Sequence, residues 1–257
     1  MSTYKNANYG INRIGGEGKG STKGQGIYEE SSYAKFDLGE KLELIDGRVF
    51  RYGQFNAAVG AGLVVSQDVS AACAAESEGT MTAAAVGATE VIVTDNTTLG
   101  AATADQFAGG YLHIIDDAGE GHQYRIKSNT AASTNAVTFT LYDGLVVAVT
   151  TDTDVAITGG LYCKLVSARG DTDYIASGVT PIAFTSGYYG WVQTGGIATV
   201  LANGTITVGQ TLMLSDGVDG AVERFDGEAV ANSHPIVGYA TFAPDNTGYV
   251  GVALQLP

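Results

Sequence analysis

The last quarter of the chain, from residue 187 to residue 256, consists of short apolar runs separated by glycine-rich turns. Alternate residues of the final run, Val250, Val252, Leu254 and Leu256, fall on one face of an extended strand. Asn203-Gly204, Asp216-Gly217 and Asp219-Gly220 supply residues that tolerate the positive φ of tight turns. The pattern predicts a compact antiparallel unit of about six short strands, a small β-barrel or sandwich.

The same alternation appears near the start and in the middle of the chain. Residues 36–44, 49–52 and 57–65 are expected to form strands, the first two joined by a hairpin turn at Asp46-Gly47. Further predicted strands are Glu90–Thr94, Gly110–Asp116, His122–Lys127, Val137–Tyr142 and Val155–Val166. Residues 71–88 and 167–183 are expected to be connectors, the first with room for a short helix at Ala71–Glu76.

This order predicts an all-β protein made of a split domain, an insertion and an arm. Residues 36–78 and 184–257 would complete one antiparallel barrel or sandwich, and residues 79–183 would form a second β domain inserted into it. Two consecutive domains, with residues 36–70 belonging to the middle one, remain an alternative. Residues 1–35 would form an extended N-terminal arm.

The arm is rich in glycine and has scattered apolar residues, among them Tyr4, Tyr9, Ile14 and Tyr28. Such a segment cannot build a core of its own. The favoured interpretation is a tether that becomes ordered on a partner or a neighbouring subunit, and the alternative is an arm folded back on its own body.

Charge separates the arm from the body. The net charge is −14, yet residues 1–24 carry Lys5, Arg13, Lys19 and Lys23 against Glu17 alone. An acidic body repels nucleic acid, so no specific nucleic-acid partner is expected, and an acidic protein surface suits the arm at least as well as phosphates do. The polar N-terminus is unlike a signal peptide and no apolar run is long enough to span a membrane, so we expect synthesis in a cytoplasm.

The two cysteines, Cys73 and Cys163, make no disulfide framework. They could pair with each other, or remain small buried hydrophobic residues in a reducing cytoplasm.

Candidate catalytic and metal-binding groups do not combine into a complete site. The Gly15–Thr22 stretch departs from a phosphate-binding loop because Gly20 separates Lys19 from Ser21. His113 and His122 lack two further zinc ligands, with Cys163 the nearest soft candidate. Asp116, Asp117 and Glu120 in one turn, and Asp152 and Asp154 in another, could bind calcium but lack EF-hand spacing, and solvated acidic turns are the simpler interpretation. Neither of these two acidic turns shows a buried carboxylic acid of the kind that glycoside hydrolysis needs.

A cluster of Trp191 with Tyr188 and Tyr189 has two interpretations. It could stack on a sugar ring, or it could lie in the core or a subunit interface, as such clusters do more often. No catalytic activity, metal or cofactor is therefore predicted.

The order of motifs resembles that of tailed-phage head decoration proteins, also called capsid cement proteins. The resemblance rests on residues 189–196 (YGWVQTGG) followed by 198–200 (ATV), on 236–240 (IVGYA) and on 251–254 (GVAL). The opening segment from residue 38 to residue 62 is similar too, and residues 109–112 and 121–126 resemble larger versions from marine phages.

This resemblance implies a virion protein on the outer surface of an icosahedral capsid, bound to the major capsid protein and assembled as a homotrimer. A tail or fibre adhesin, or a carbohydrate-binding module, is the alternative, and a polysaccharide-cleaving enzyme is a third class. The residues expected to contact the shell or a neighbouring subunit are those of the arm: Tyr4, Lys5, Tyr9, Arg13, Ile14, Lys19, Lys23 and Tyr28.

Overall fold

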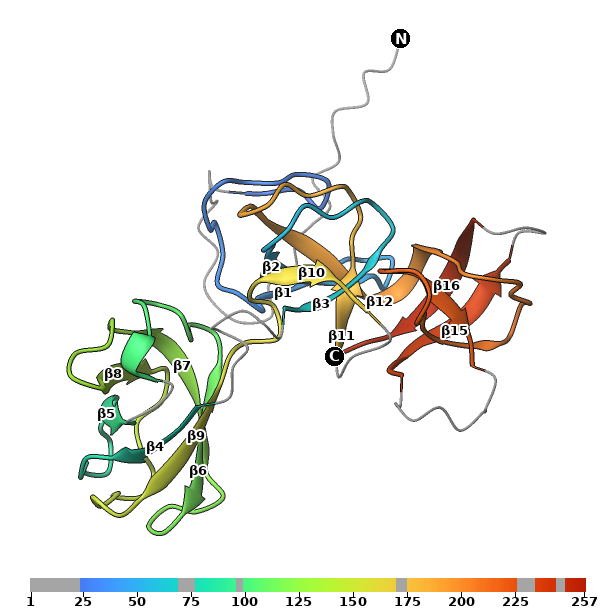
Figure 1. The fold of residues 1–257 in the computed structure, drawn as a ribbon. Helices are drawn as coiled ribbons and strands as arrows, with labels where there is room; N and C mark the ends of the chain where they lie inside the picture. Colours follow the sequence, from blue (N-terminus) through green and yellow to red (C-terminus); the bar gives the residue numbers. More distant parts are fainter. Residues whose placement is uncertain (1–23, 69–76, 96–98, 170–174, 226–233, 244–247) are drawn as a thin grey trace. The chain divides into compact units, whose positions relative to one another are not determined.

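The computed structural model describes residues 24–68, 77–95, 99–169, 175–225, 234–243 and 248–257. Within these ranges the chain forms sixteen β-strands and one short 3-10 helix, Leu99–Ala101 (Figure 1). The all-β prediction is confirmed. No helix in the described ranges has the length and apolar character needed to cross a bilayer.

The chain divides into two compact units. Unit 1 contains residues 1–67 and 164–257, and unit 2 contains residues 68–163. The inserted segment thus has its boundaries at residues 68 and 163, where the sequence pattern had suggested 79 and 183. The charge is unequal: unit 2 holds 12 of the 27 Asp and Glu residues but only two of the 13 Lys and Arg, a net charge of −10 against −4 for unit 1.

Unit 1 is a ten-stranded antiparallel arrangement in the order β10-β3-β11-β12-β16-β15-β13-β14, with β2 also paired to β12 and β1 to β2. Its strands are β1 (Lys41–Glu43), β2 (Val49–Gln54), β3 (Val64–Gln67), β10 (Leu165–Ser167), β11 (Ala176–Val179), β12 (Tyr189–Leu201), β13 (Thr211–Leu214), β14 (Val222–Arg224), β15 (Ile236–Phe242) and β16 (Tyr249–Gln255). The Asp46-Gly47 hairpin joins β1 to β2 as predicted.

Strand β12 is the longest and connects the two halves of unit 1 (Figure 1). Its first half pairs with β2, from Tyr189 opposite Gln54 to Gly195 opposite Val49. Its second half pairs with β16, from Gly195 opposite Gln255 to Leu201 opposite Tyr249. The alternation read from residues 250–256 is confirmed, since Val250, Val252 and Leu254 are buried in one core cluster.

The end of β12 also meets β14, through a bridge between Ala202 and Val222. Strands β12, β16, β15, β13 and β14 thereby enclose an apolar core that includes Val200, Leu212, Val237 and Val252. This is the small barrel-like unit that the C-terminal pattern predicts.

A second core in unit 1 is aromatic. Phe50, Tyr52 and Trp191 are almost fully buried, and Phe36 packs on both Tyr52 and Trp191 with ring centroids 5.2 and 5.0 Å apart. Trp191 therefore belongs to the core, and the sugar-stacking interpretation of this residue is wrong because its side chain is only 2% exposed.

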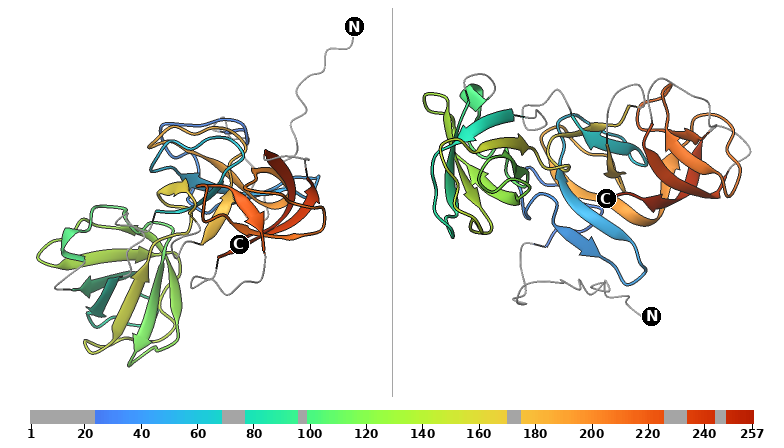
Figure 2. Two further views of the ribbon diagram at one scale, coloured as in Figure 1. Left: turned by 45° about the vertical axis from the view of Figure 1, so that its right-hand side comes forward. Right: turned by 90° about the horizontal axis from the view of Figure 1, so that it is seen from below.

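Unit 2 is a closed barrel in the order β4-β5-β8-β7-β6-β9 (Figure 2). Its strands are β4 (Ser77–Met81), β5 (Glu90–Thr94), β6 (Tyr111–Asp116), β7 (Gln123–Asn129), β8 (Ala136–Leu141) and β9 (Asp154–Thr158). Alternate residues are buried in β5, β6 and β8, as in Val91 and Val93 of β5, and fill an interior that contains Phe107, Phe139 and Leu112.

The ends of the inserted unit leave unit 1 from neighbouring strands. Gln67, the last residue of β3, pairs with Leu165, the first residue of β10. Inside unit 2, the first strand pairs with the last, with Ser77 opposite Ile157. In each unit, the two strands nearest the junction between the units therefore pair with each other: β3 with β10 in unit 1, and β4 with β9 in unit 2.

Three predicted features of the middle segment were wrong. Residues 77–81 and 176–179 form strands where connectors were expected, and the predicted strand Val155–Val166 is two strands, β9 and β10, in different units. Residues 159–164 separate them, beginning with Gly159 and Gly160, and a side chain at Gly160 would collide with the backbone of Gly109. The possible helix at residues 71–76 lies outside the described residues.

Cys163 is disulfide-bonded, so of the two possibilities the structure contains the bonded form. The only other cysteine of the sequence, Cys73, lies outside the described residues.

Candidate functional site

The point where the arm joins the body is fixed by the buried side chain of Gln25. Its Nε2 donates to the carbonyl oxygens of Glu29 at 2.7 Å and Tyr189 at 2.9 Å, and its Oε1 accepts from the Tyr52 hydroxyl at 2.7 Å. Its backbone oxygen accepts from Nε1 of Trp191 at 3.0 Å. With these contacts, the chain is attached firmly to the aromatic core at residue 25.

Further contacts follow along residues 26–31. Ser31 and Tyr189 exchange two backbone hydrogen bonds, of 3.0 and 2.8 Å. The Glu30 carboxylate accepts from the backbone N–H of Thr185 at 2.7 Å and from its hydroxyl at 2.9 Å. Residues 24–35, which the sequence assigned to the arm, therefore pack on the body of their own chain. The rest of the predicted arm, residues 1–23, lies outside the described residues.

Of the eight predicted partner-binding residues, the structure places only Tyr28. The other seven, Tyr4, Lys5, Tyr9, Arg13, Ile14, Lys19 and Lys23, lie outside the described residues. The Tyr28 ring is 62% exposed and lines a groove on unit 1. This groove is the candidate site.

The groove has a volume of about 430 Å³ and follows the second half of β12. Its lining combines aromatic, polar and small apolar side chains, and comprises Tyr28, Arg48, Ala61, Gly62, Val179, Thr180, Pro181, Gln193, Ile197, Ala198, Thr199 and Tyr249. Tyr249 and Ile197 are 48% and 63% exposed. The volume falls within the range of sites that hold small ligands or short peptide segments.

Gly62 brings one end of the groove close to β12. Its φ of +70° is in the left-handed region, and a side chain there would meet the Tyr249 ring and the backbone oxygen of Thr199. The Gly62 oxygen accepts from the N–H of Leu201 at 2.8 Å. At the opposite end, the turn at Gly47-Arg48 lies against Gly196, where β2 leaves β12.

Between these two ends, one edge of β12 has no partner strand. Residues 197–201 pair with β16 on one side, and within the described chain no second strand pairs with them. The N–H of Leu201 points to Gly62, whereas that of Ala202 points to Gly248 on the β16 side. Because backbone groups alternate along an antiparallel ladder, those of Ile197 and Thr199 also point away from β16.

Gln193 partly satisfies this edge. Its Nε2 donates to the oxygens of Gly195 and Ile197, both at 3.0 Å. The N–H groups of Ile197 and Thr199 have no hydrogen-bond acceptor among the described residues. The groove therefore offers two backbone donors at an open strand edge.

Arg48 carries the charge at the groove. Its Nε donates to Asp46 at 2.8 Å, and its Nη1 donates to the Tyr28 hydroxyl at 3.4 Å. The hydrogen bond to Tyr28 and the nearby carboxylate raise the pKa of Arg48, and hydrogen bonds from the Arg48 backbone and side chain lower the pKa of Asp46. In the described chain no group accepts a hydrogen bond from Nη2, so this side of the guanidinium can bind an anion.

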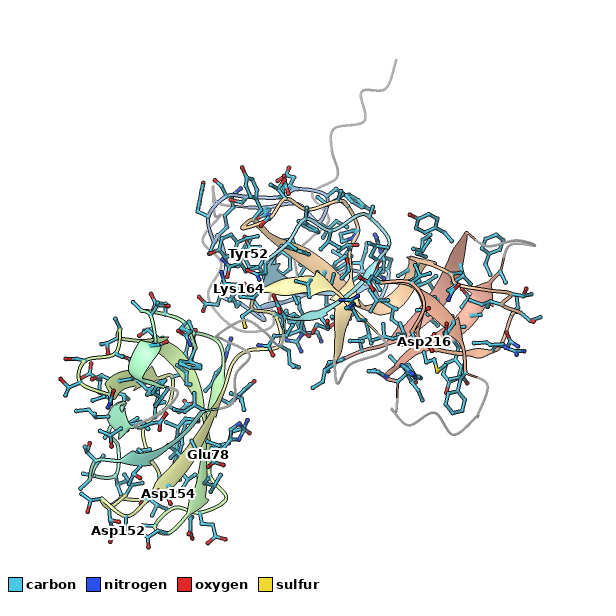
Figure 3. The ribbon with its side chains drawn as sticks, viewed as in Figure 1. Tyr52, Glu78, Asp152, Asp154, Lys164 and Asp216 are labelled. Atoms are coloured by element: carbon cyan, nitrogen blue, oxygen red, sulfur yellow. The ribbon has the colours of Figure 1, made fainter. Side chains whose placement is uncertain are left out.

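A second concave surface lies on unit 2 and is acidic. The two acidic turns that the sequence showed separately come together, because Asp116 pairs with Asp154 across β6 and β9 and Thr150 donates to Asp117 at 2.8 Å. Glu78, Asp154 and Asp152 lie along one flank of the barrel in Figure 3. A hollow of about 290 Å³ is lined by Glu78, Asp95 and Asp154 together with Gly79, Thr80, Thr94 and Ile115.

Hydrogen bonds inside this surface occupy several of the carboxylates. Asp154 accepts from the Thr80 hydroxyl at 3.0 Å, and Asp95 accepts from the N–H of Leu99 at 2.9 Å. Hydrogen bonds from the backbone of Ala118 and from Thr150 lower the pKa of Asp117. Over the described ranges, no three His, Cys, Asp or Glu side chains gather closely enough to hold a metal ion.

His113 and His122, considered as possible zinc ligands, have separate partners. Nε2 of His113 lies 3.1 Å from the Thr158 hydroxyl, and Nδ1 of His122 lies 2.7 Å from the Gly119 oxygen. In the ladder His113 is opposite Gln123, so the two imidazoles occupy different positions.

Sequence reasoning missed Gln25, Arg48 and the open edge of β12. A polar residue in a glycine-rich segment gives no sign that it is buried, and an unpaired edge depends on where β2 and β16 end. The Asp46-Gly47 turn was the one available signal, because it places Arg48 at the end of a hairpin.

Comparison with known proteins gives no relative: no family model, curated protein or solved structure matches the chain.

Proposed function

We propose that the protein is a structural component of a tailed-phage virion that decorates the outer surface of the capsid. The observation that carries the proposal is the fixed attachment of the arm. In the sequence a basic, glycine-rich segment of 23 residues precedes an acidic all-β body, and Gln25, close to the start of that body, is held by four hydrogen bonds. A tether needs a firm attachment at its base, because force on a loose one would peel the chain from the body.

The resembling motifs also support the proposal, because they occupy adjacent strands of one sheet. Residues 189–200 form β12, residues 236–240 lie in β15, and residues 251–254 lie in β16 between them. Their similarity to the decoration proteins therefore concerns one structural unit rather than three unrelated stretches.

The arm would supply the contacts with the shell. Ordering a flexible segment costs about 1–2 kcal/mol per residue, so buried apolar anchors must offset much of that cost. Tyr4, Tyr9 and Ile14 are the proposed anchors. Lys5, Arg13, Lys19 and Lys23 would add attraction to an acidic surface, and this contribution would weaken as salt rises. We further propose a homotrimer that binds the major capsid protein and has no catalytic activity.

The test compares decoration of bare shells by three forms of the protein. The truncation should remove residues 1–23 and no more, because a longer deletion would remove Gln25 and disturb the body. We expect the full-length protein to bind to the outer surface of the shell and the truncated form to bind weakly at all salt concentrations. A variant with the four arm cations changed to glutamine should lose affinity mainly at low salt.

Electron microscopy of whole particles decides the location. Hundreds of copies over the head are expected, and tens of copies confined to the tail would favour the adhesin instead. Occupancy by the truncated form equal to that of the full chain would overturn the role of the arm. Mass measurement of a stable monomer, both in solution and released from particles, would overturn the trimer.

A further inference from the structure

We propose that the groove beside β12 binds an extended, acidic segment of a partner polypeptide, which adds a strand at the open edge between Arg48 and Gly62. The binding itself stands on the geometry of unit 1. That the partner is the shell protein rests on the proposed function.

The unpaired edge of β12 at residues 197–201 can pair with an additional strand. A strand edge with unpaired N–H groups is a template for another chain, and folded proteins rarely leave one exposed without a covering element. Here β2 covers the first half of β12 and turns away at Arg48, while Gly62 approaches again at Leu201. An incoming segment would continue the line of β2 and accept hydrogen bonds from Ile197 and Thr199.

The side walls suit an extended peptide. Alternate side chains of a bound strand would lie on the outer face beside Ile197, Thr199 and Tyr249, which are exposed. The intervening side chains would face Val179 and Pro181 across the groove. A peptide strand places its side chains on two faces, and this groove offers contacts for both.

The charge favours an acidic segment. No carboxylate is among the described residues that line the groove, and Arg48 is the one cation there. Its Nε side is held by Asp46, which orients the guanidinium and leaves Nη2 for an anion. Residues 1–23 are basic and end five residues before Tyr28 of the groove in the sequence, so their charge would add to the attraction for the same acidic partner.

The same charge argues against the arm as the occupant. Residues 1–23 carry four cations and one carboxylate, so an arm lying in the groove, from the same chain or a neighbouring copy, would place positive charge near Arg48. Basic segments are therefore expected to bind more weakly than acidic ones.

The probe is a library of displayed random octapeptides, selected on the immobilised full-length protein. We expect the recovered peptides to be rich in β-branched residues and to contain at least one Asp or Glu. A recovered peptide is then synthesised with its acidic residue, and again with lysine in that position, and both are titrated by fluorescence anisotropy.

Two pairs of variants locate the binding. T199P removes the N–H that would donate to the peptide, at a position where the β16 ladder does not use it, and should lower affinity about tenfold. T199A keeps the N–H and should lower affinity no more than about twofold. R48Q should abolish the preference for the acidic peptide over its lysine version, whereas R224Q, which removes a charge outside the groove, should preserve it.

Several outcomes would overturn the proposal. These are recovery of no peptide, equal binding by T199P and T199A, recovery of mainly basic peptides like residues 1–23, or an acidic preference that survives R48Q. If T199P does not fold, as judged by the fluorescence of Trp191, the R48Q and R224Q comparison decides alone. If micrographs place the protein away from the capsid, the groove would still bind an acidic peptide, but the peptide would come from a protein other than the shell protein. The failure of the proposed function is therefore distinguishable from the failure of this proposal.

Discussion

Replacing Gln25 with alanine should destabilise unit 1 by about 3 kcal/mol. The substitution removes the acceptor of the buried Tyr52 hydroxyl and two hydrogen bonds donated by Nε2. A buried polar group left without a partner costs about 1–3 kcal/mol, and each remaining bond contributes about 0.5–1.5 kcal/mol. Tyr189 loses less than the others, since its oxygen also accepts from Ser31.

The chain supplies a local reporter for this measurement. Trp191 is its only tryptophan and donates to the backbone oxygen of Gln25. Tryptophan fluorescence during urea unfolding therefore follows unit 1 alone, and unit 2 is silent in this signal. We expect Q25A to lower the midpoint of the fluorescence transition without changing its slope.

Matched controls separate the side chain from general effects. Q255A changes an exposed glutamine on β16 and should leave the free energy of unfolding within about 0.5 kcal/mol of the wild type. Removing residues 1–23 should also leave it unchanged, whereas removing residues 1–26 should reproduce the loss seen in Q25A. A Q25A protein within about 0.5 kcal/mol of the wild type would refute the reasoning, and the attachment of the arm would have to depend on other contacts.

Three more predictions follow from single contacts. Burial raises the pKa of Tyr52 above its usual 10.0, so the stability that this buried hydroxyl contributes is complete below about pH 10 and should decline as pH rises further. Urea unfolding of Y52F at increasing pH should lack this alkaline decline, and an equal decline in both proteins would contradict the prediction. G110A should destabilise unit 2 by several kcal/mol because its new side chain would collide with the Thr158 oxygen, whereas G121A, strained only by its φ of +82°, should cost about 1 kcal/mol in thermal unfolding; equal losses would show that the barrel adjusts. Because Cys163 is disulfide-bonded, the denatured protein should show no reactive thiol until reductant is added, and a thiol titrating without reductant would contradict the bond.

Alternation along the chain was enough to predict the strands that bury one face. β5 was located at its observed bounds, and the hairpin of β1 and β2 followed from Asp46-Gly47. β4 was missed because residues 77–81 (SEGTM) contain a single apolar side chain, Met81, and the backbone of this strand is held by its neighbours β5 and β9. Local pattern cannot show pairing that is imposed by strands far along the chain.

The candidate site shows the same limit more strongly. Apart from the nearby Glu29, the partners of Gln25 lie 27, 164 and 166 residues away along the chain, so no spacing rule connects them. Arg48 and Thr199 likewise line one groove only because β12 passes from β2 to β16. The charge contrast between residues 1–24 and the rest of the chain was available from composition alone, and it supports both proposals.

The pairing of Gln67 with Leu165 has a consequence for protein engineering. To unit 1, the whole inserted barrel is equivalent to the loop of a β-hairpin, and a short turn between β3 and β10 could replace it. Since Ser77 and Ile157 are also paired, unit 2 offers two adjacent ends to any host sheet. Such a junction allows one module to be exchanged for another without altering either core, so cargo domains whose ends lie close together should be accepted at residues 68 and 163.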